Sequence, residues 1–348
     1  MGGGGAERAL SQLAGPLALA GCDVHVALLR GGAHEERLAA SGATIHRIDV
    51  YGNYDPRLIW SIDRIVRRVR PQILQTWLTQ MDVAGGFVAR IRKLPWILSE
   101  RSSGVGYKRS AKNRLRVAVA GGAMLIQANS RGGADFWAEK QPRIPRVVVP
   151  NPLPLAQIEA APPADVQRFG GRPVILYVGR LSHIKNIMNL VQAIEDIPDG
   201  VLVMLGEGNL EADVRGWIAE RNLSGRIVLE GFVSDVWSRM KSATMLVSVS
   251  AYEGRPNAVL EAAAARVPLV LSDIPAHRDL LGPPGGALFV DGGDPKSIAA
   301  GICEVLRDPA AAGQRARNAY TAVAPCTPDV VAAEQMRVYE ELLRKVER

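Results

Sequence analysis

Short runs of apolar residues alternate with helical patterns along almost the whole chain. In the first half, these runs predict buried strands at residues 24–29, 73–77, 96–99, 124–128 and 146–149. After residue 170 the pattern starts again and predicts strands at residues 174–178, 201–205, 227–229, 245–249, 269–272 and 287–290. Apolar strands separated by helices are typical of parallel sheets covered on both faces. Two rounds of this pattern predict an α/β protein with two Rossmann-like, doubly wound domains.

Proline residues mark the boundary between the two rounds. The segment Pro150-Asn151-Pro152-Leu153-Pro154 cannot continue a central strand or a helix, and Pro162-Pro163 and Gly170-Gly171 follow it. Near the end of the chain, the apolar spacing is that of a helix. We therefore expect an N-terminal domain at residues 1–150, a linker at 151–171, a C-terminal domain at 172–325, and a helix at 326–348 that packs back on the N-terminal domain.

The chain opens with a glycine-rich segment, residues 2–5, that runs into a helical pattern at residues 9–20. In a doubly wound domain such a turn follows the first strand, which lies in the middle of the sheet. The sequence therefore predicts an N-terminal sheet that lacks its first strand and is gapped or rearranged between the strands at 24–29 and 73–77. Buried unpaired backbone groups would make this domain poorly stable, so we expect the native start about 8–15 residues earlier.

The composition is that of an ordinary globular protein, with 47% hydrophobic and 22% charged residues. No run of about 18 consecutive apolar residues occurs, so the sequence predicts no transmembrane helix. The three cysteines, Cys22, Cys303 and Cys326, lie far apart without a metal-type or redox spacing. We expect them to be reduced structural thiols in a cytoplasmic protein.

The net charge of +7 is unevenly distributed. Residues 1–170 contain 23 Lys and Arg against 13 Asp and Glu, a net charge of +10, whereas the remaining residues contain 19 against 22, a net charge of −3. A basic surface attracts nucleic acid, anionic lipid or an anionic substrate, unless it consists of ordinary solvated helix faces. Aromatic residues make up only 5% of the chain, which argues against stacking on nucleic acid bases. We expect weak, salt-sensitive attachment to the inner face of an anionic membrane, with the segment 107–119 taking part.

The strongest candidate site follows a predicted strand of the second half. There Glu253 and Gly254 precede Pro256, which suits the first turn of a helix, and this helix begins near Asn257. Its free N–H groups form an anion site at the carboxyl edge of the sheet. A bound diphosphate would leave Glu261, one turn along the helix, near a ribose and Glu253 near a sugar. Carboxylates suit both positions, because they accept hydrogen bonds from hydroxyl groups. The alternative is a pair of surface glutamates on a capped helix.

A second group of candidates follows the first strand of the C-terminal domain. Gly179, Arg180 and Lys185 lie where that strand ends and a helix opens. Sheets of α/β proteins bind ligands at this edge, so two cations there could neutralise a leaving diphosphate without a metal. The alternative is ordinary solvated loop charge.

The C-terminal half contains five motifs in the order and spacing of one family. They are Val178-Gly179-Arg180 with Lys185-Asn186, Leu205-Gly206-Glu207-Gly208, Gly231-Phe232-Val233, Glu253-Gly254 to Glu261, and Ser272-Asp273-Ile274-Pro275. With Gly4-Gly5-Ala6-Glu7-Arg8 and the joint at Val149-Pro150-Asn151-Pro152, they make the whole chain resemble the family-4 retaining glycosyltransferases of GT-B architecture. The two glutamates with seven residues between them are that family's signature.

The resemblance implies two domains that face each other across a cleft, with the donor bound by the C-terminal one. It implies a retaining, metal-independent hexosyltransferase that needs no cofactor. Such an enzyme moves a sugar from a UDP- or GDP-sugar to the hydroxyl of a glycan or lipid-linked acceptor, in surface polysaccharide or glycolipid assembly. The residues that the resemblance makes catalytic are Arg180 and Lys185, which grip the phosphates, and Glu253, which binds sugar hydroxyls. The residues that it assigns to donor binding are Gly4, Gly5, Gly179, Phe232, Val233, Gly254, Asn257 and Glu261.

The acceptor side departs from the family pattern. Many members carry a histidine after the strand equivalent to residues 96–99, whereas here Glu100 and Arg101 follow it. We expect one of these two residues to face the acceptor. His183 and His277 are expected in loops near the cleft.

Other enzyme classes fit the sequence less well. A metal-dependent glycosyltransferase needs two aspartates one residue apart, and no Asp-x-Asp occurs. A dinucleotide dehydrogenase needs a third glycine after Gly206-Glu207-Gly208. Two alternatives stay open: a GT-B-type sugar-nucleotide epimerase, and a non-catalytic protein that binds sugar nucleotides or uses its basic surface for binding.

Overall fold

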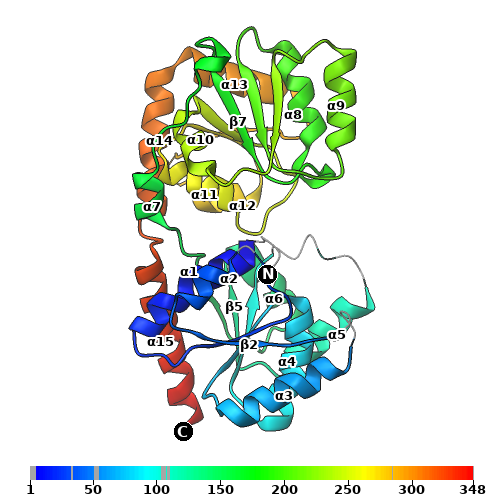
Figure 1. Ribbon diagram of the computed structural model, residues 1–348, viewed down its shortest axis with the longest axis vertical. Coiled ribbons are helices and arrows are strands. Elements are labelled where there is room, and N and C mark those ends of the chain that lie inside the picture. The colour runs from blue at the N-terminus through cyan, green and yellow to red at the C-terminus, as the bar shows by residue number, and fades with distance from the viewer. Residues whose placement is uncertain are drawn as a thin grey trace. The chain divides into compact units, whose positions relative to one another are not determined.

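The computed structural model describes residues 5–32, 34–50, 55–102, 107, 110–283 and 285–347. Helices and parallel strands alternate up to residue 290 and three helices follow, which confirms the predicted α/β class (Figure 1). The chain divides into two compact units, one made of Met1–Leu153 with Cys326–Arg348 and the other of Pro154–Pro325. None of the helices described is both long enough and apolar enough to span a membrane.

The strands of the first unit form two separate parallel ladders. One ladder pairs β1 (His25–Leu28) with β2 (Thr44–Arg47), and the other has the order β3 (Leu74–Trp77), β4 (Trp96–Glu100), β5 (Leu125–Ala128) and β6 (Arg146–Val148). Among the described residues no ladder joins β1 to β3. The sheet is thus interrupted at the place where the sequence predicts a gap. The sequence does not predict β2, because its residues are partly or fully exposed and form no apolar run.

Seven helices are described in the first unit. They are α1 (Gly5–Leu19), α2 (Glu35–Ala39), α3 (Arg57–Val69), α4 (Thr79–Arg92), α5 (Ala111–Ala120), α6 (Arg131–Lys140) and α15 (Pro328–Val346). The helices α3, α4 and α5 pack side by side, and α1 packs against α15. Leu13 and Leu17 of α1 share a buried apolar cluster with Val331 and Leu342 of α15.

Buried polar contacts attach α15 to the sheet of the first unit. The side-chain amides of Gln127 and Gln335 exchange two hydrogen bonds, of 2.6 and 2.9 Å, and both residues are buried. The Tyr339 hydroxyl donates to the amide oxygen of Gln75. Because each buried polar group has a partner, these bonds fix the position of the helix along the strands without the cost of an unpaired group.

The second unit is one six-stranded parallel sheet with helices on both faces. The strand order is β12-β11-β10-β7-β8-β9. The strands are β7 (Val174–Val178), β8 (Val201–Leu205), β9 (Ile227–Gly231), β10 (Met245–Ser248), β11 (Leu269–Ser272) and β12 (Leu288–Val290). The helices are α7 (Leu155–Ala160), α8 (Ile187–Ala193), α9 (Glu211–Glu220), α10 (Val236–Ser242), α11 (Asn257–Ala264), α12 (Pro275–Leu281), α13 (Pro295–Arg307) and α14 (Pro309–Val323). Short 3₁₀ turns lie at Gln167–Phe169, His183–Lys185 and Ile194–Asp196.

The segment expected to be a linker, residues 151–171, contains regular structure. It includes α7 and the 3₁₀ turn Gln167–Phe169, and Ile158 of α7 is completely buried. The division between the two compact units falls between Leu153 and Pro154. The division falls within the proline-rich segment 150–154, and most of the segment beyond it packs as part of the second unit.

The strand order of the second sheet reverses at β7. The chain runs from β7 outward through β8 to β9, then returns to β10 on the other side of β7. Loops that follow β7 and β10 therefore leave the sheet in opposite directions, which is where open α/β sheets bind ligands. The loops after β7 and β8 also touch: a Cβ on Gly206, whose φ is +128°, would lie 2.1 Å from the carbonyl oxygen of Gly179. Only glycine allows that approach.

Candidate active site

Two loops at the carboxyl edge of the second sheet bring Lys185 and Glu253 together. Lys185 ends the 3₁₀ turn after β7, and Glu253 lies in the loop after β10. The N–H of Ala251 donates to the carbonyl of Ile184 at 2.8 Å and so joins the two loops. The Lys185 ammonium forms an ion pair with Oε1 of Glu253. A charged pair therefore stands at the point where the strand order reverses.

The surroundings of this pair are partly shielded from water. The Lys185 side chain is 25% exposed and the Glu253 side chain 13%. Partial burial reduces solvent screening, so the attraction is stronger than in an exposed pair. The next residue, Asn186, adopts a positive φ of 50° and its amide donates to the carbonyl of Val249 at 2.9 Å. This bond holds the start of α8 against the end of β10.

Arg180 lies in the same loop as Lys185, and its backbone is anchored by Tyr177. The Tyr177 hydroxyl donates to the carbonyl of Arg180 at 2.9 Å. Burial, together with the nearby carboxylate of Glu253, raises the pKa of Tyr177, so its hydroxyl remains a donor at neutral pH. The Arg180 side chain itself is exposed. The loop thus holds one paired cation and one cation that is open to a ligand.

The helix α11 begins at Asn257, as the sequence predicts, with Pro256 at its N-cap. Glu261 lies one turn further and is only 5% exposed. The indole N–H of Trp237, from the neighbouring helix α10, donates to Oε2 of Glu261 at 2.8 Å. Trp237 belongs to none of the sequence motifs, and it holds the carboxylate in a fixed orientation at the edge of the site.

The residues after β9 are placed at the same edge of the sheet. The Phe232 side chain is 78% exposed and Val233 is partly buried. The N–H of Gly206 donates to the carbonyl of Gly231 at 2.7 Å, which ties the loops after β8 and β9 together. An exposed aromatic ring beside a packed glycine loop offers a surface on which a planar base can stack.

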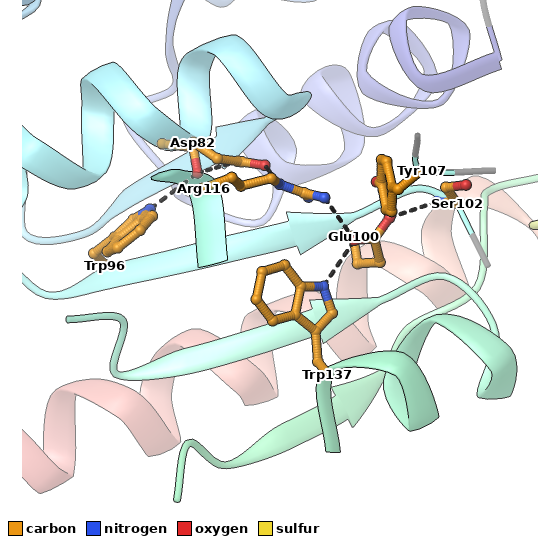
Figure 2. A network of polar contacts seen from close by, with 8 residues as sticks. Asp82, Trp96, Glu100, Ser102, Tyr107, Arg116 and Trp137 are labelled. Carbon is orange, nitrogen blue, oxygen red and sulfur yellow. Dashed lines mark hydrogen bonds and ion pairs between the residues drawn. The ribbon is translucent and has the colours of Figure 1, made fainter. Parts of the chain in front are cut away.

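The first unit contains the remaining candidates. Gly5 begins α1, whereas Gly4 lies outside the described residues. Glu100, at the end of β4, is completely buried. Its Oε1 accepts from the Tyr107 hydroxyl at 2.6 Å and from the N–H of Ser102 at 2.7 Å. Figure 2 shows these residues around the carboxylate.

The other oxygen of Glu100 belongs to the same buried network. Oε2 accepts from the Trp137 indole at 2.7 Å and from Nη1 of Arg116 at 3.0 Å (Figure 2). Nε of Arg116 donates to Asp82 at 2.8 Å, and the Thr76 hydroxyl also donates to Asp82, at 2.6 Å. Four donors thus occupy the Glu100 carboxylate inside the domain. This arrangement gives Glu100 no surface to present to an acceptor.

Arg101, the other acceptor-side candidate, is placed differently. Its guanidinium lies over the Trp77 ring, 3.5 Å from the ring centroid, and its Nη1 donates to the amide oxygen of Asn151 at 3.0 Å. These contacts join the carboxyl ends of β3 and β4 to Asn151, which lies in the segment beyond β6. Of the two candidates, Arg101 is therefore the one that remains at the edge where a ligand could reach it.

The histidine expected in a loop, His277, is instead completely buried in α12. The sequence does not predict this burial, because a lone histidine gives no sign of whether it is buried. The same holds for Ser250 and Ser272, two buried polar residues at the ends of β10 and β11. A polar residue directly after an apolar strand is a usable signal, but only the fold shows that these three lie together.

Family models of known proteins match both halves of the chain. The family described as "Glycosyl transferases group 1" matches residues 162–322, and the family "Glycosyl transferase 4-like domain" matches residues 4–152. The two matches follow one another in the chain and together cover most of it. The chain belongs to the family-4 type of glycosyltransferases. The comparisons give no support to the epimerase that the sequence left open.

Named relatives are glycosyltransferases from several bacteria. The chain is 30% identical to the 2-deoxystreptamine glucosyltransferase of Streptomyces kanamyceticus over 47% of this chain and 46% of that protein, so this match spans about half of the relative. It is 23% identical to the lipopolysaccharide core biosynthesis glycosyltransferase LpsE of Rhizobium meliloti, over 88% of this chain and 86% of LpsE. The fold is that of HepE from Anabaena, solved in complex with UDP and glucose: the TM-score is 0.85 at 17% identity, covering 97% of this chain and 96% of HepE.

The buried network of this glycosyltransferase should make its stability depend on pH. Burial raises the pKa of Asp82 to about 6 from its ordinary 3.8, although Arg116 and Thr76 favour the charged form. Between about pH 4 and pH 6 the unfolded chain therefore loses this proton while the folded chain keeps it. We expect the free energy of unfolding of the wild type, relative to Asp82→Asn, to fall as the pH rises through this window and then to level off.

Urea unfolding of both proteins at several pH values measures this difference, since the titrations of residues distant from Asp82 are common to the two. Asp135→Asn, which removes an exposed aspartate of α6, is the matched control. A difference between wild type and Asp82→Asn that stays constant from pH 4 to pH 8 would contradict the raised pKa.

Proposed function

We propose that this glycosyltransferase is a retaining, metal-independent hexosyltransferase. It moves a sugar from a UDP- or GDP-sugar to an acceptor hydroxyl in surface polysaccharide or glycolipid assembly. The observation that carries the proposal is the pairing of Lys185 with Glu253 where the strand order reverses between β7 and β10. A cation there meets the donor's diphosphate, and a carboxylate beside it meets the hydroxyls of the sugar.

The positive charge needed for the leaving group is present in the chain's own residues. Arg180 is exposed in the loop after β7, Lys185 lies in the same loop, and α11, which begins at Asn257, directs the positive end of its dipole to this edge. Glu253 pairs with Lys185. A diphosphate would compete for the ammonium, and charge that develops on the phosphate as the sugar leaves would strengthen this contact.

The other contacts to the nucleotide sugar would come from residues at the same carboxyl edge of the second sheet. Glu261, held by Trp237, would accept hydrogen bonds from ribose hydroxyls. Phe232 and the backbone near Val233 would line the site of the base, and Gly179 would let the backbone approach the phosphates. HepE, which shares the fold, is solved with UDP and glucose, which supports a nucleotide-sugar donor.

On the acceptor side we assign Arg101 rather than Glu100. The guanidinium of Arg101 is fixed by Trp77 and Asn151, so it is preorganised to bind a polar or anionic group of an acceptor. Glu100 would support it from within the domain, because the Glu100 carboxylate binds the N–H of Ser102, the residue after Arg101. The relative LpsE acts in lipopolysaccharide core biosynthesis, which supports a glycan or lipid-linked acceptor.

The first unit would also make peripheral contact with an anionic membrane. The helices α3, α4 and α5 pack side by side and expose Trp60, Phe87, Ile91 and Leu115. The Arg64 guanidinium lies 5.7 Å from the centroid of the Trp60 ring. Apolar side chains interspersed with arginine on neighbouring helices suit the boundary between anionic headgroups and acyl chains.

Incubation with UDP- and GDP-sugars and a glycan or lipid-linked acceptor tests the function. We expect transfer with the anomeric configuration of the donor, seen by NMR of the product, and equal activity with a strong chelator present. Activity that is lost with the chelator and restored by magnesium or manganese would contradict metal independence. Isomerised donor without transfer would instead indicate an epimerase, and donor binding without any product would indicate a binding protein.

Two substitutions separate the roles of the site residues. Glu261→Ala removes charged hydrogen bonds to ribose, so we expect donor binding to weaken by about 1.5–3 kcal/mol. Lys185→Ala should mainly lower turnover, because the charge that Lys185 stabilises grows during the reaction. Calorimetric donor titration and steady-state kinetics measure the two effects. An unchanged donor Kd in the first variant, or an unchanged kcat in the second, would refute that residue's role.

Membrane attachment is tested by co-sedimentation with vesicles that contain phosphatidylglycerol. We expect the protein to sediment at low salt and to be released at high salt, since the Debye length shortens. Trp60→Ser combined with Ile91→Ser should reduce sedimentation. Val330→Ser, which replaces an exposed apolar residue of α15, is the control. No sedimentation of the wild type at low salt would end the proposal.

A further inference from the structure

A chain of buried hydrogen bonds runs from α12 to the Glu253 carboxylate. The Ser250 hydroxyl donates to Oε1 of Glu253 at 2.8 Å. The carbonyl of Ser250 accepts from the Ser272 hydroxyl at 2.7 Å. Both serines are buried, and they stand at the carboxyl ends of the neighbouring strands β10 and β11. The loop that carries Glu253 is therefore tied to the next strand of the sheet.

His277 completes this chain. Its Nδ1 lies 2.9 Å from the carbonyl oxygen of Ser272 and 3.3 Å from the Ser272 hydroxyl. A carbonyl can only accept, so Nδ1 must carry the ring proton. Burial lowers the pKa of His277, which keeps the ring neutral. The side chain thus acts as a fixed donor that orients Ser272, and it does so from a completely buried position.

The hydrogen bonds on Glu253 are unequally divided between its two oxygens. Ser250 and Lys185 both bind Oε1. Among the described residues, no hydrogen bond is made to Oε2. The carboxylate is therefore held by one oxygen, and the other is left to accept from a ligand.

We propose that Ser250, Ser272 and His277 are positioning residues that aim Oε2 of Glu253 at a hydroxyl of the transferred sugar. The inference rests on the proposed function of Glu253. A diphosphate that draws Lys185 away leaves Ser250 as the bond that keeps Glu253 in place. The chain from His277 then prevents the loop from following the lysine, so Glu253 keeps its position for the sugar contact when the phosphates bind.

The experiment compares binding of a nucleotide sugar with binding of its nucleoside diphosphate. The probes are UDP-glucose, UDP-N-acetylglucosamine and GDP-mannose, with UDP and GDP, and the pair that the wild type binds best is used. For Ser250→Ala we expect the Kd of the nucleotide sugar to rise about tenfold, as for one hydrogen bond to a charged group, and the Kd of the diphosphate to stay within about twofold. Ser248→Ala, two residues earlier and within β10, is the control and should leave both Kd values unchanged.

His277 gives a second, independent test. Asparagine can place an amide N–H close to the position of Nδ1, whereas leucine cannot donate. We expect His277→Asn to bind the nucleotide sugar like the wild type, and His277→Leu to lose affinity for it as Ser250→Ala does. In a Glu253→Ala background, Ser250→Ala should cause no further loss, because the side chain that Ser250 orients is absent.

The outcomes separate this inference from the proposed function. If the wild type binds none of the nucleotide sugars, the proposed function fails. If the wild type binds and transfers the sugar but Ser250→Ala behaves like Ser248→Ala, the positioning role is wrong. A variant that loses affinity for the sugar and the diphosphate equally would show a merely structural role and would also overturn the inference.

Discussion

Parallel pairing between β7 and β10 is the constraint on which the candidate site depends. Met245 pairs with Ile175 and Leu246 with Leu176, although the chain passes through β8 and β9 between them. Because both strands point the same way, their carboxyl ends meet, and the loops that follow them must part on either side. Lys185 arrives from one loop and Glu253 from the other, and the buried ladder holds them at a fixed separation. The pairing of these two charged side chains is thus a consequence of strand order.

The first unit uses charge differently, inside the domain. Asp82 and Glu100 share the single guanidinium of Arg116, and all three are buried. Removing charges from water is costly, and an ion pair in the interior repays this only when every remaining donor and acceptor is satisfied. Thr76, Tyr107 and Trp137 supply those bonds. The network therefore links α4 and α5 to the end of β4, and its bond to the N–H of Ser102 fixes the backbone beside Arg101.

Much of the fold follows from local patterns, and the exceptions have physical causes. Apolar runs predict all described strands except β2, whose residues are partly solvated and so lack the pattern. Proline marks the unit boundary, yet α7 forms just beyond it because Ile158 is buried against the second unit. The sequence makes Glu100 one of the two residues expected to face the sugar acceptor, since a charged residue at the end of a strand is usually at the surface. Its burial depends on Arg116 and Trp137, which lie 16 and 37 positions away.

The sequence by itself determined the α/β class, the two rounds of parallel strands and the motifs that place Lys185, Glu253 and Glu261 after particular strands. These features depend on hydrophobic periodicity and on residues close together in the chain, which a sequence records directly. Only the tertiary structure decided which side chains meet. The bonds from His277 through Ser272 and Ser250 to Glu253 cross three elements. Such contacts depend on strand order and on burial, and both are set by packing between distant segments.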